Sequence, residues 1–372
     1  MRALLIGGGG YLGRKVVEAL GRVRDLDVAL GHRSPGGPRD THLDLLDPAT
    51  FPVMKKHDVV VNCADSVAAP PERMLAYALQ NGVTLVDSNA DPASLERILF
   101  MHRGASQRRG GDLTGRAILG VGIFPGLSNL LAAGVCQRLQ GPVERLEVGI
   151  RVTALSGAGG GMVALMRQSL FNNCVVYEGG ERVEVPPIGP AIPMRFVSGE
   201  YPALRVGLPE TIMLHWSRGV PNVASYLSPY PTPLRAGLRL TGAIARSSPK
   251  AGRVLSSAMH RMLAPLRTSV LSERPSSVEI AVMANRVGVD RSVGPSAALA
   301  AKEGVLTAAY AIAGAISLVD GLRQGGLQPG VYLPDEALKL PELIAAMKAV
   351  APGGLDLTVQ ERDLHGVAAG AS

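Results

Sequence analysis

The chain has 372 residues, of which 47% are hydrophobic, and its formal net charge is +7 at pH 7. This length predicts two domains, and the aromatic content of only 4% predicts a mainly aliphatic core. The three cysteines, Cys63, Cys136 and Cys174, have the spacing of neither a metal site nor a disulfide framework, so we expect no metal and a reducing, cytoplasmic setting. No signal peptide or membrane-spanning helix is expected, because charged residues bracket the longest apolar stretch, 301–322.

The N-terminus combines a short apolar strand, Ala3–Ile6, with a run of glycines and then a segment of helical apolar spacing, Val16–Leu20. Gly8 is expected to form the tight turn, Gly10 to let the backbone approach phosphates, and Gly13 to let helix and strand pack closely. The unpaired N–H groups of the first helical turn would then face an anion. The sequence therefore predicts a dinucleotide site, with cofactor contacts from the loop residues Gly8, Gly10, Tyr11, Leu12 and Gly13.

Strands and helices alternate up to about residue 125. Further strands are expected at Leu26–Gly31, His42–Leu46, Asp58–Asn62, Val83–Asp87 and Ala117–Val121, with helices at Pro71–Gln80 and Ala93–Gly104. Such alternation predicts parallel pairing with right-handed crossovers. The expected fold class is α/β, a doubly wound parallel sheet that binds its ligand at the carboxyl ends of the strands.

The pattern changes after Pro125–Gly126, where a helix at Leu127–Leu139 is followed by alternating apolar and polar residues at Arg145–Val152. Strand-like segments, including Ile212–Trp216, then predict an α+β domain with an antiparallel sheet. We expect a cofactor domain at 1–140, completed by helices within 296–350. The second domain is expected at 141–295, with a candidate edge strand at 355–359.

The end of the second strand indicates which dinucleotide binds. Enzymes that prefer NAD place an acidic residue there to bind the ribose hydroxyls, whereas this chain has His32, Arg33 and Ser34. Arg33 can stack on adenine and form a forked pair with a 2′-phosphate, which favours NADP. Asp44 is either an adenine-side contact or the cap of the following turn.

Candidate chemistry lies at the ends of the next strands. Asn62, Cys63 and Ala64 are expected beside the cofactor, with Cys63 as a packed residue rather than a nucleophile. Asp87 is a general acid, a substrate anchor or a cap of the turn at Ser88. Tyr177 is the other candidate proton donor.

Four segments resemble the saccharopine dehydrogenase-like oxidoreductases. They are Ile6–Arg14 with Gly31–Ser34, Val60–Ala64 with Gly82–Ser88, Gly120–Ser128, and an alanine-rich helix followed by Gly330–Glu336. The resemblance implies a Rossmann domain, an inserted α+β domain used for substrate and dimerisation, hydride transfer with NADP, and a homodimer. It does not imply saccharopine as the substrate.

The chain departs from this family at Phe124, where lysine-pathway members have an aspartate before Pro-Gly. A phenyl ring cannot act on a charged amine, which favours a more apolar substrate. The glycine-rich loop 156–162 resembles a loop of the family that approaches the nicotinamide, although it is otherwise a plain turn. The expected substrate-side residues are Ser88, Phe124, Met162 and Arg167.

The basic charge is concentrated in the segment 211–272, which contains eight arginines and lysines and no acidic residue. It predicts a pair of surface helices, a docking face for an anionic partner such as an acyl carrier protein or anionic lipid, or an arginine lining for an acidic substrate. Nucleic acid is not expected as a partner, since aromatic residues do not alternate with the basic ones.

These observations favour an NADPH-dependent oxidoreductase that transfers hydride to a C=N or C=O bond of a small metabolite. An enoyl reductase acting on a lipid-like or polyketide acyl chain is the alternative within enzymes. A non-catalytic NADP-binding sensor is the alternative from another class, because no acid–base pair stands out in the sequence.

Overall fold

The computed structural model describes the chain except for residues 35, 38–39, 107–112, 140, 154–164, 166–167, 171, 231–236, 240–241, 244–276, 289–293 and 363–372. The described chain divides into two compact units. Unit 1 comprises Met1–Leu130 and Val305–Leu355, and unit 2 comprises Leu131–Gly304 and Asp356–Ser372.

Unit 1 is built on a parallel seven-stranded sheet in the order β15-β6-β5-β4-β1-β2-β3. Its strands are β1 (Arg2–Ile6), β2 (Asp27–His32), β3 (Asp40–His42), β4 (Val59–Asn62), β5 (Thr84–Asp87), β6 (Arg116–Ile118) and β15 (Gly330–Tyr332). All four residues of β4 are buried, as expected for a central strand covered on both faces. The predicted doubly wound α/β fold is confirmed.

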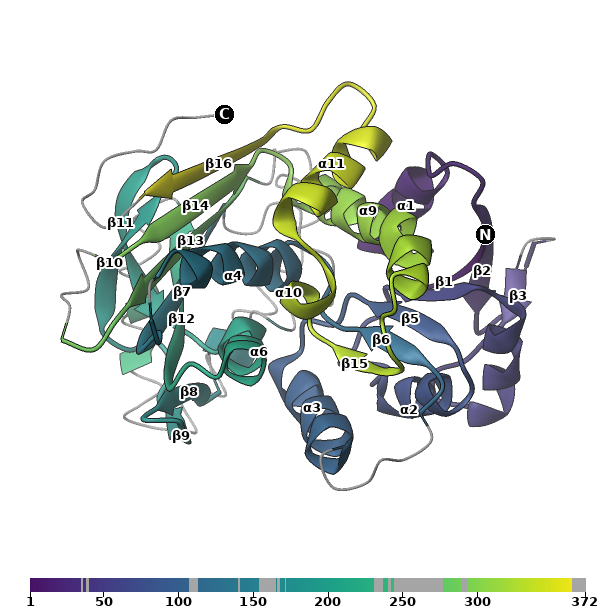
Figure 1. Cartoon of the computed structure of the whole chain (residues 1–372), viewed down its shortest axis with the longest axis horizontal. Coiled ribbons are helices and arrows are strands. Elements are labelled where there is room, and N and C mark those ends of the chain that lie inside the picture. The colour runs from purple at the N-terminus through teal and green to yellow at the C-terminus, as the bar shows by residue number, and fades with distance from the viewer. Residues whose placement is uncertain are drawn as a thin grey trace. The chain divides into compact units, whose positions relative to one another are not determined.

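The helices of unit 1 cover both faces of this sheet, with α1, α9 and α11 on one side and α2 and α3 on the other (Figure 1). Right-handed crossovers produce this arrangement, because the chain moves outward from β1 in one direction and outward from β4 in the opposite direction. The helices are α1 (Tyr11–Leu20), η1 (Pro48–Lys56), α2 (Glu72–Gln80), α3 (Pro92–Ser106), α9 (Gly304–Gln324), α10 (Pro334–Ala337) and α11 (Leu340–Val350).

Helix α9 is the one described helix that is long and apolar enough to cross a membrane, a test that the core helix of a soluble protein also passes. Its buried side chains include Ile312, Ile316 and Val319. A side chain at Gly314 would lie 3.1 Å from the Met347 backbone nitrogen of α11, so glycine there allows the two helices to pack closely.

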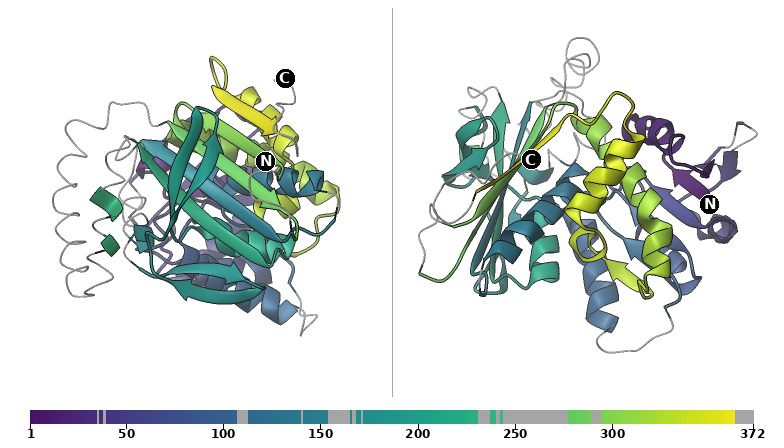
Figure 2. Two further views of the ribbon diagram at one scale, coloured as in Figure 1. Left: turned by 90° about the vertical axis from the view of Figure 1, so that its left-hand side faces the viewer. Right: turned by 45° about the horizontal axis from the view of Figure 1, so that its top comes forward.

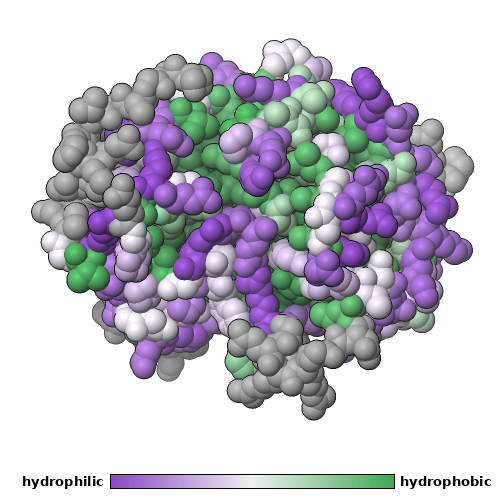
Figure 3. Space-filling model, viewed as in Figure 1, coloured by the Kyte–Doolittle hydropathy of each residue, from purple (hydrophilic) through white to green (hydrophobic). Residues whose placement is uncertain are grey.

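The outer edge of the first sheet is a polar surface. In the space-filling view of Figure 3, hydrophilic side chains cover the right-hand margin, where Figure 1 shows β2 and β3.

Unit 2 contains a nine-stranded mixed sheet, seen face on in the left panel of Figure 2. Its strands are β7 (Arg145–Thr153), β8 (Cys174–Glu178), β9 (Glu181–Val185), β10 (Ala191–Phe196), β11 (Gly199–Arg205), β12 (Asn222–Tyr230), β13 (Val278–Asn285), β14 (Ser296–Ala301) and β16 (Leu357–Arg362). Most neighbours are antiparallel, as predicted, but β7 and β12 run parallel. The described elements of this part of the chain include the helices α4 (Ser128–Arg138) and α6 (Pro209–Arg218).

An ion pair and two hydrogen bonds on Glu279 of β13 hold the turn of the β10–β11 hairpin. Arg151 pairs with Glu279 at 3.1 Å, and the backbone nitrogen and hydroxyl of Ser198, in the hairpin turn, donate to the Glu279 carboxylate at 2.8 and 2.7 Å. The Arg151 guanidinium also lies 4.1 Å from the ring centre of Tyr201 and 4.9 Å from that of Tyr230.

Two expectations about local structure were wrong. The strand expected at His42–Leu46 lies earlier in the chain, as β3 at Asp40–His42. Ile212–Trp216 belongs to the helix α6, which begins at Pro209 and ends before Gly219 in the left-handed conformation (φ 64°).

The division into units can be set beside the expected domain bounds. The helices α9, α10 and α11, within 296–350, return to unit 1, while residues 296–301 form the strand β14 of unit 2. The chain passes from unit 1 to unit 2 after Leu130, within α4.

Candidate functional site

The carboxyl ends of the parallel strands bring the predicted cofactor residues to one edge of the first sheet. Ile6 is aligned with Gly31 of β2 on one side and with Asn62 of β4 on the other, and Asn62 is aligned with Asp87 of β5. Chain order reverses between β1 and β4, since β2 follows β1 outward in one direction and β5 follows β4 outward in the other. Open α/β sheets bind ligands at such a reversal point.

The glycine loop makes its tight turn at Gly7, where φ is +80°, and not at Gly8 as predicted. A Cβ at Gly7 would lie 2.7 Å from the Ala64 nitrogen and 2.7 Å from the Cys63 carbonyl carbon, so the loop passes directly against the backbone at the end of β4. The Gly10 N–H donates to the Gly7 oxygen at 3.0 Å and closes the turn. Because the sequence contains four successive glycines, a reading that began at Gly8 missed the first constrained position.

Gly13 has the predicted packing role. A Cβ there would lie 2.0 Å from the Gly7 carbonyl oxygen, so only glycine lets the first turn of α1 lie against the strand end. A Cβ at Gly9, by contrast, would meet nothing within 4 Å. The loop is therefore open on its outer side at Gly9.

The N-terminus of α1 is suited to an anion. All residues of this helix are described, and it has neither an acidic residue in its first turn nor a side-chain cap at Gly10. The N–H groups of Tyr11 and Leu12 in that first turn lack intrahelical partners, and the helix dipole adds positive potential. The Tyr11 side chain is 41% exposed beside them.

The end of β2 presents an exposed cationic turn. Arg33 and Ser34 are exposed, and His32 lies 3.6 Å from the Asp40 carboxylate. The sequence reading did not consider Asp40, which accepts hydrogen bonds from the Gly36 and Gly37 N–H groups at 2.8 Å each. The Gly36 bond is the main reason that the pKa of Asp40 is lowered, so this carboxylate is committed to its own turn.

Asp44 caps the turn that follows β3, which is one of the two roles predicted for it. Its Oδ1 accepts from the Leu46 N–H at 2.9 Å, and its own N–H donates to the Thr50 hydroxyl at 3.0 Å. These contacts fix the turn after β3. Contact with an adenine ring stays a prediction for Asp44.

Asn62 and Asp87 are brought together across two neighbouring strands. The Asn62 Nδ2 group donates to Asp87 Oδ1 at 2.9 Å, and Asn62 Oδ1 accepts from the Ala64 N–H at 3.1 Å. The N–H and hydroxyl of Ser88 both donate to the Asn62 carbonyl, each at 3.0 Å. The chain segment that faces Gly7 is thus held in place from β5.

Asp87 itself is completely buried, and that burial raises its pKa to about 7. The Asn89 N–H also donates to Oδ1, at 3.2 Å, so part of the predicted turn-capping role is present. Burial likewise raises the pKa of the Cys63 thiol to about 12, which disfavours the thiolate and fits its predicted packing role. Ser88 is half-buried beside them.

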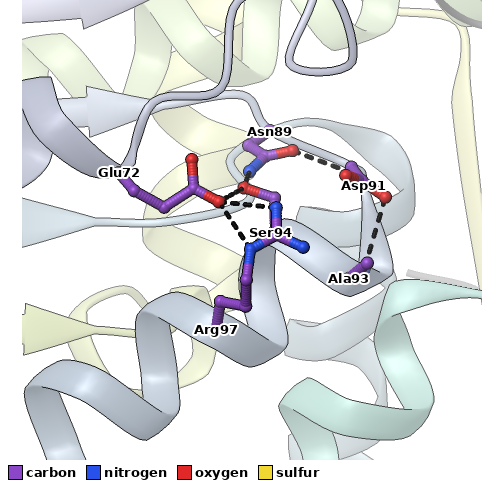
Figure 4. Close-up of polar contacts among 6 residues, drawn as sticks. All are labelled: Glu72, Asn89, Asp91, Ala93, Ser94 and Arg97. Atoms are coloured by element: carbon purple, nitrogen blue, oxygen red, sulfur yellow. Dashed lines mark hydrogen bonds and ion pairs between the residues drawn. The ribbon is translucent and has the colours of Figure 1, made fainter.

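A polar network that the sequence analysis missed supports the loop after β5 (Figure 4). Glu72 of α2 accepts from the Ser94 hydroxyl at 3.1 Å and from Arg97 at 2.7 Å. The Asn89 side chain donates to the Ser94 hydroxyl at 3.0 Å and accepts from the Asp91 N–H at 2.8 Å. The signal was available, because an aspartate followed by proline, as at 91–92, is typical of a helix start.

Phe124 lies in the turn that follows β6. Its side chain is half-buried, and the turn is fixed by the Gly126 N–H, which donates to Asn129 Oδ1 at 3.1 Å. Gly126 has a φ of +126°, a conformation that favours glycine. Just before this turn, the Val121 N–H donates to the Asp87 carbonyl at 2.9 Å, which connects it to β5.

The candidates in the second half of the chain are placed differently. Tyr177 of β8 is buried and stacks on His215 of α6, with ring centres 3.6 Å apart and planes at 9°. Tyr177 belongs to unit 2, whereas Asp87 belongs to unit 1. Met162 and Arg167 lie outside the described residues, as does most of the basic segment 211–272. The expected anionic partner and homodimer remain predictions.

Comparison with known proteins gives no family assignment. No family model matches the chain, and no curated protein matches it. Among solved structures, it is similar to C. glutamicum DAP dehydrogenase in complex with DAP, at 12% identity over 95% of this chain and 96% of the other, with a TM-score of 0.47.

It is also similar to a mutant meso-dapdh from Clostridium tetani E88 with DAP, at 15% identity over 92% and 95% of the two chains and a TM-score of 0.46. An engineered D-amino acid dehydrogenase bound to NADP+ matches at 14% identity over 96% and 97%, again with a TM-score of 0.46. Likeness at this level defines neither a substrate nor a cofactor. The function must therefore be argued from the site itself.

Proposed function

We propose that the chain is an NADPH-dependent oxidoreductase that transfers hydride to a C=N or C=O bond of a small metabolite. The observation that carries this proposal is the glycine loop at the reversal point of the first sheet. Gly7 and Gly13 bring strand, loop and helix into contact, and the first turn of α1 presents N–H groups without an internal acid or cap. A pyrophosphate is the ligand that this arrangement suits.

The cationic turn after β2 supports NADP as the form that binds. A 2′-phosphate beside Arg33 and Ser34 would find an exposed guanidinium and a hydroxyl. The carboxylate of the same turn, Asp40, is engaged by the Gly36 and Gly37 N–H groups. NADPH supplies the hydride when bound, and the residues of the chain bind and orient it.

Arg33 provides the direct test of this assignment. Replacing Arg33 with Asp removes a charge-assisted hydrogen bond to the 2′-phosphate and adds repulsion. The loss of the bond alone costs about 1.5–3 kcal/mol, so NADPH should bind at least tenfold more weakly. NADH, which lacks the 2′-phosphate, should bind Arg33→Asp at least as well as it binds the wild type, so the preference shifts from NADP towards NAD. Titration of cofactor fluorescence measures both affinities.

The matched control is Arg24→Asp, which makes the same charge change at an exposed position. Arg24 lies between α1 and β2, and so precedes the amino end of β2, whereas Arg33 follows its carboxyl end. Equal loss of NADPH affinity in both variants would show a general charge effect and contradict the assignment of the 2′-phosphate to Arg33. If the wild-type protein binds neither NADPH nor NADH, the proposed function is wrong.

Phe124 favours the reduction of a more apolar group, so an enoyl substrate is the second candidate. Its half-buried phenyl ring offers contact area and no charge. Assays that follow NADPH oxidation with separate panels of imines, carbonyl compounds and enoyl thioesters distinguish these classes. Tight NADPH binding without turnover of any of these substrates would instead support the alternative of a non-catalytic NADP-binding sensor.

A further inference from the structure

Asp87 has an environment that the proposed hydride transfer does not use. Its side chain is 0% exposed, and both of its hydrogen-bond donors, the Asn62 amide and the Asn89 N–H, contact the same oxygen, Oδ1. The second oxygen, Oδ2, is buried and has no hydrogen-bond partner among the described residues. A carboxylate in this position keeps half of its charge unsolvated, whereas the neutral acid does not.

Burial and a neighbouring carboxylate disfavour the charge of Asp87, and two hydrogen bonds favour it. Burial is the largest influence, and the Glu72 carboxylate of α2 adds repulsion, while the bonds from Asn62 and Asn89 act in the opposite direction. The Cys63 thiol, at the end of β4, is the other titratable group coupled to it. With a pKa raised to about 7, both forms of Asp87 are populated near neutral pH.

Asn62 connects Asp87 to the cofactor edge. One end of its amide bonds to Asp87 at 2.9 Å and the other accepts from the Ala64 N–H at 3.1 Å. The Cys63–Ala64 backbone in turn lies against Gly7, where even a methyl group would approach within 2.7 Å. A change at Asp87 is therefore transmitted through a single side chain to the backbone that borders the glycine loop.

We propose that Asp87 is a positioning residue for the dinucleotide: its Oδ1 holds Asn62 and the Cys63–Ala64 backbone in the arrangement that binds the cofactor, and its ionisation weakens binding. The reason is electrostatic, because a negative charge behind this edge would repel the anionic pyrophosphate in a region of low dielectric. This inference rests on the proposed function. By linkage, cofactor binding must then favour proton uptake by Asp87.

The expected size follows from the fraction of neutral Asp87. If only that form binds, a pKa of about 7 leaves roughly one molecule in eleven competent at pH 8, so NADPH binds about tenfold more weakly at pH 8 than at pH 6. The measurement is the NADPH dissociation constant of the full-length protein between pH 6 and pH 8.5, compared with that of variants at each pH. The wild-type dissociation constant is divided by that of a variant at the same pH. This ratio removes the effect of the titration of the cofactor's own phosphate, because both proteins bind the same cofactor.

Two replacements distinguish a positioning role from a catalytic one. Asp87→Asn keeps an uncharged acceptor for Asn62, so it should bind NADPH as tightly as the low-pH wild type at every pH. Asp87→Ala removes the acceptor, so it should bind weakly at every pH. Asp58→Asn, just before the amino end of β4, is the matched control and should keep the wild-type pH dependence.

A second measurement requires no variant. NADPH is titrated into the wild type in a calorimeter at pH 7.5, in two buffers of different ionisation enthalpy. The difference in heat between the buffers should show that the protein takes up protons on binding, beyond any change in the protonation of NADPH itself. Wild-type binding with no pH dependence relative to Asp87→Asn, or no proton uptake, overturns the role of Asp87 and leaves the proposed function intact. Absence of any dinucleotide binding by the wild type overturns both.

Discussion

The contact between Gly13 and Gly7 leads to a sharp prediction for Gly13→Ala. The added methyl group would lie 2.0 Å from the Gly7 carbonyl oxygen, and ordinary contact begins at 3.4 Å, so α1 and the loop must separate by about 1.4 Å. Both atoms belong to backbone, so no side chain can rotate to relieve the overlap. The first turn of α1, which provides the anion-binding N–H groups, would move with the helix.

Overpacking of this kind costs about 1–3 kcal/mol, which for a unit of this size lowers the melting temperature by about 2–10 °C. NADPH affinity should fall at least tenfold, because the N–H groups lose their alignment by more than 1 Å. Differential scanning fluorimetry measures the first effect, and titration of cofactor fluorescence measures the second.

Gly9→Ala is the control for stability, because its Cβ would meet nothing within 4 Å. It adds the same methyl group to the same loop and should leave the melting temperature unchanged. If Gly13→Ala also left both the melting temperature and the NADPH affinity unchanged, the close packing of α1 against the strand end would not have the role given to it here.

Two further predictions concern stability. The contribution of Asp87 to the free energy of unfolding of the cofactor-free protein should decrease between about pH 4 and pH 7, because Asp87 has a pKa of about 7 when folded and about 3.9 when unfolded. Between pH 5 and pH 8, the free energy of unfolding of Asp87→Asn, measured by urea denaturation, should therefore increase by about 1–3 kcal/mol relative to that of the wild type. A difference between the two proteins that stays constant with pH would contradict the burial of this acid. In unit 2, Glu279→Ala should cost about 1.5–3 kcal/mol, because the half-buried Arg151 loses its charged partner. The double variant Arg151→Met with Glu279→Leu should recover much of that loss, and failure to do so would show that the tyrosine contacts of Arg151 matter more than the ion pair.

The first sheet was largely predictable because its signals are local. The strands β1, β2, β4 and β5 are short apolar runs beside a turn or a helix signal, and parallel order follows from the alternation, whereas the short strand β3 is polar and gave no such signal. The residues at the strand ends could be named in advance for the same reason. The contacts between these residues could not be predicted. The bond between Asn62 and Asp87, for example, depends on the register of two strands, and the two residues are 25 positions apart in the sequence.

The second sheet was less predictable because its pairings are non-local. Its strand β7 pairs with β12 and β13, and β14 pairs with β16, across long intervening segments. The error at Ile212–Trp216 has a different cause. Apolar and β-branched residues there suggested a strand, whereas Pro209 at the start and Gly219 at the end were helix signals that outweighed them. The turn at Gly7 was missed because four successive glycines allow more than one spacing.

The way the chain alternates between its two units has a consequence for synthesis on the ribosome. The first sheet lacks its edge strand β15 until Gly330–Tyr332 has emerged, and the second lacks β16 until Leu357–Arg362 has emerged. Neither unit can therefore finish folding before nearly all of the described chain has been translated, even though β1 is made first. During that interval β6 and β14 present unpaired edges, which are the kind of edge that pairs with other chains and leads to aggregation.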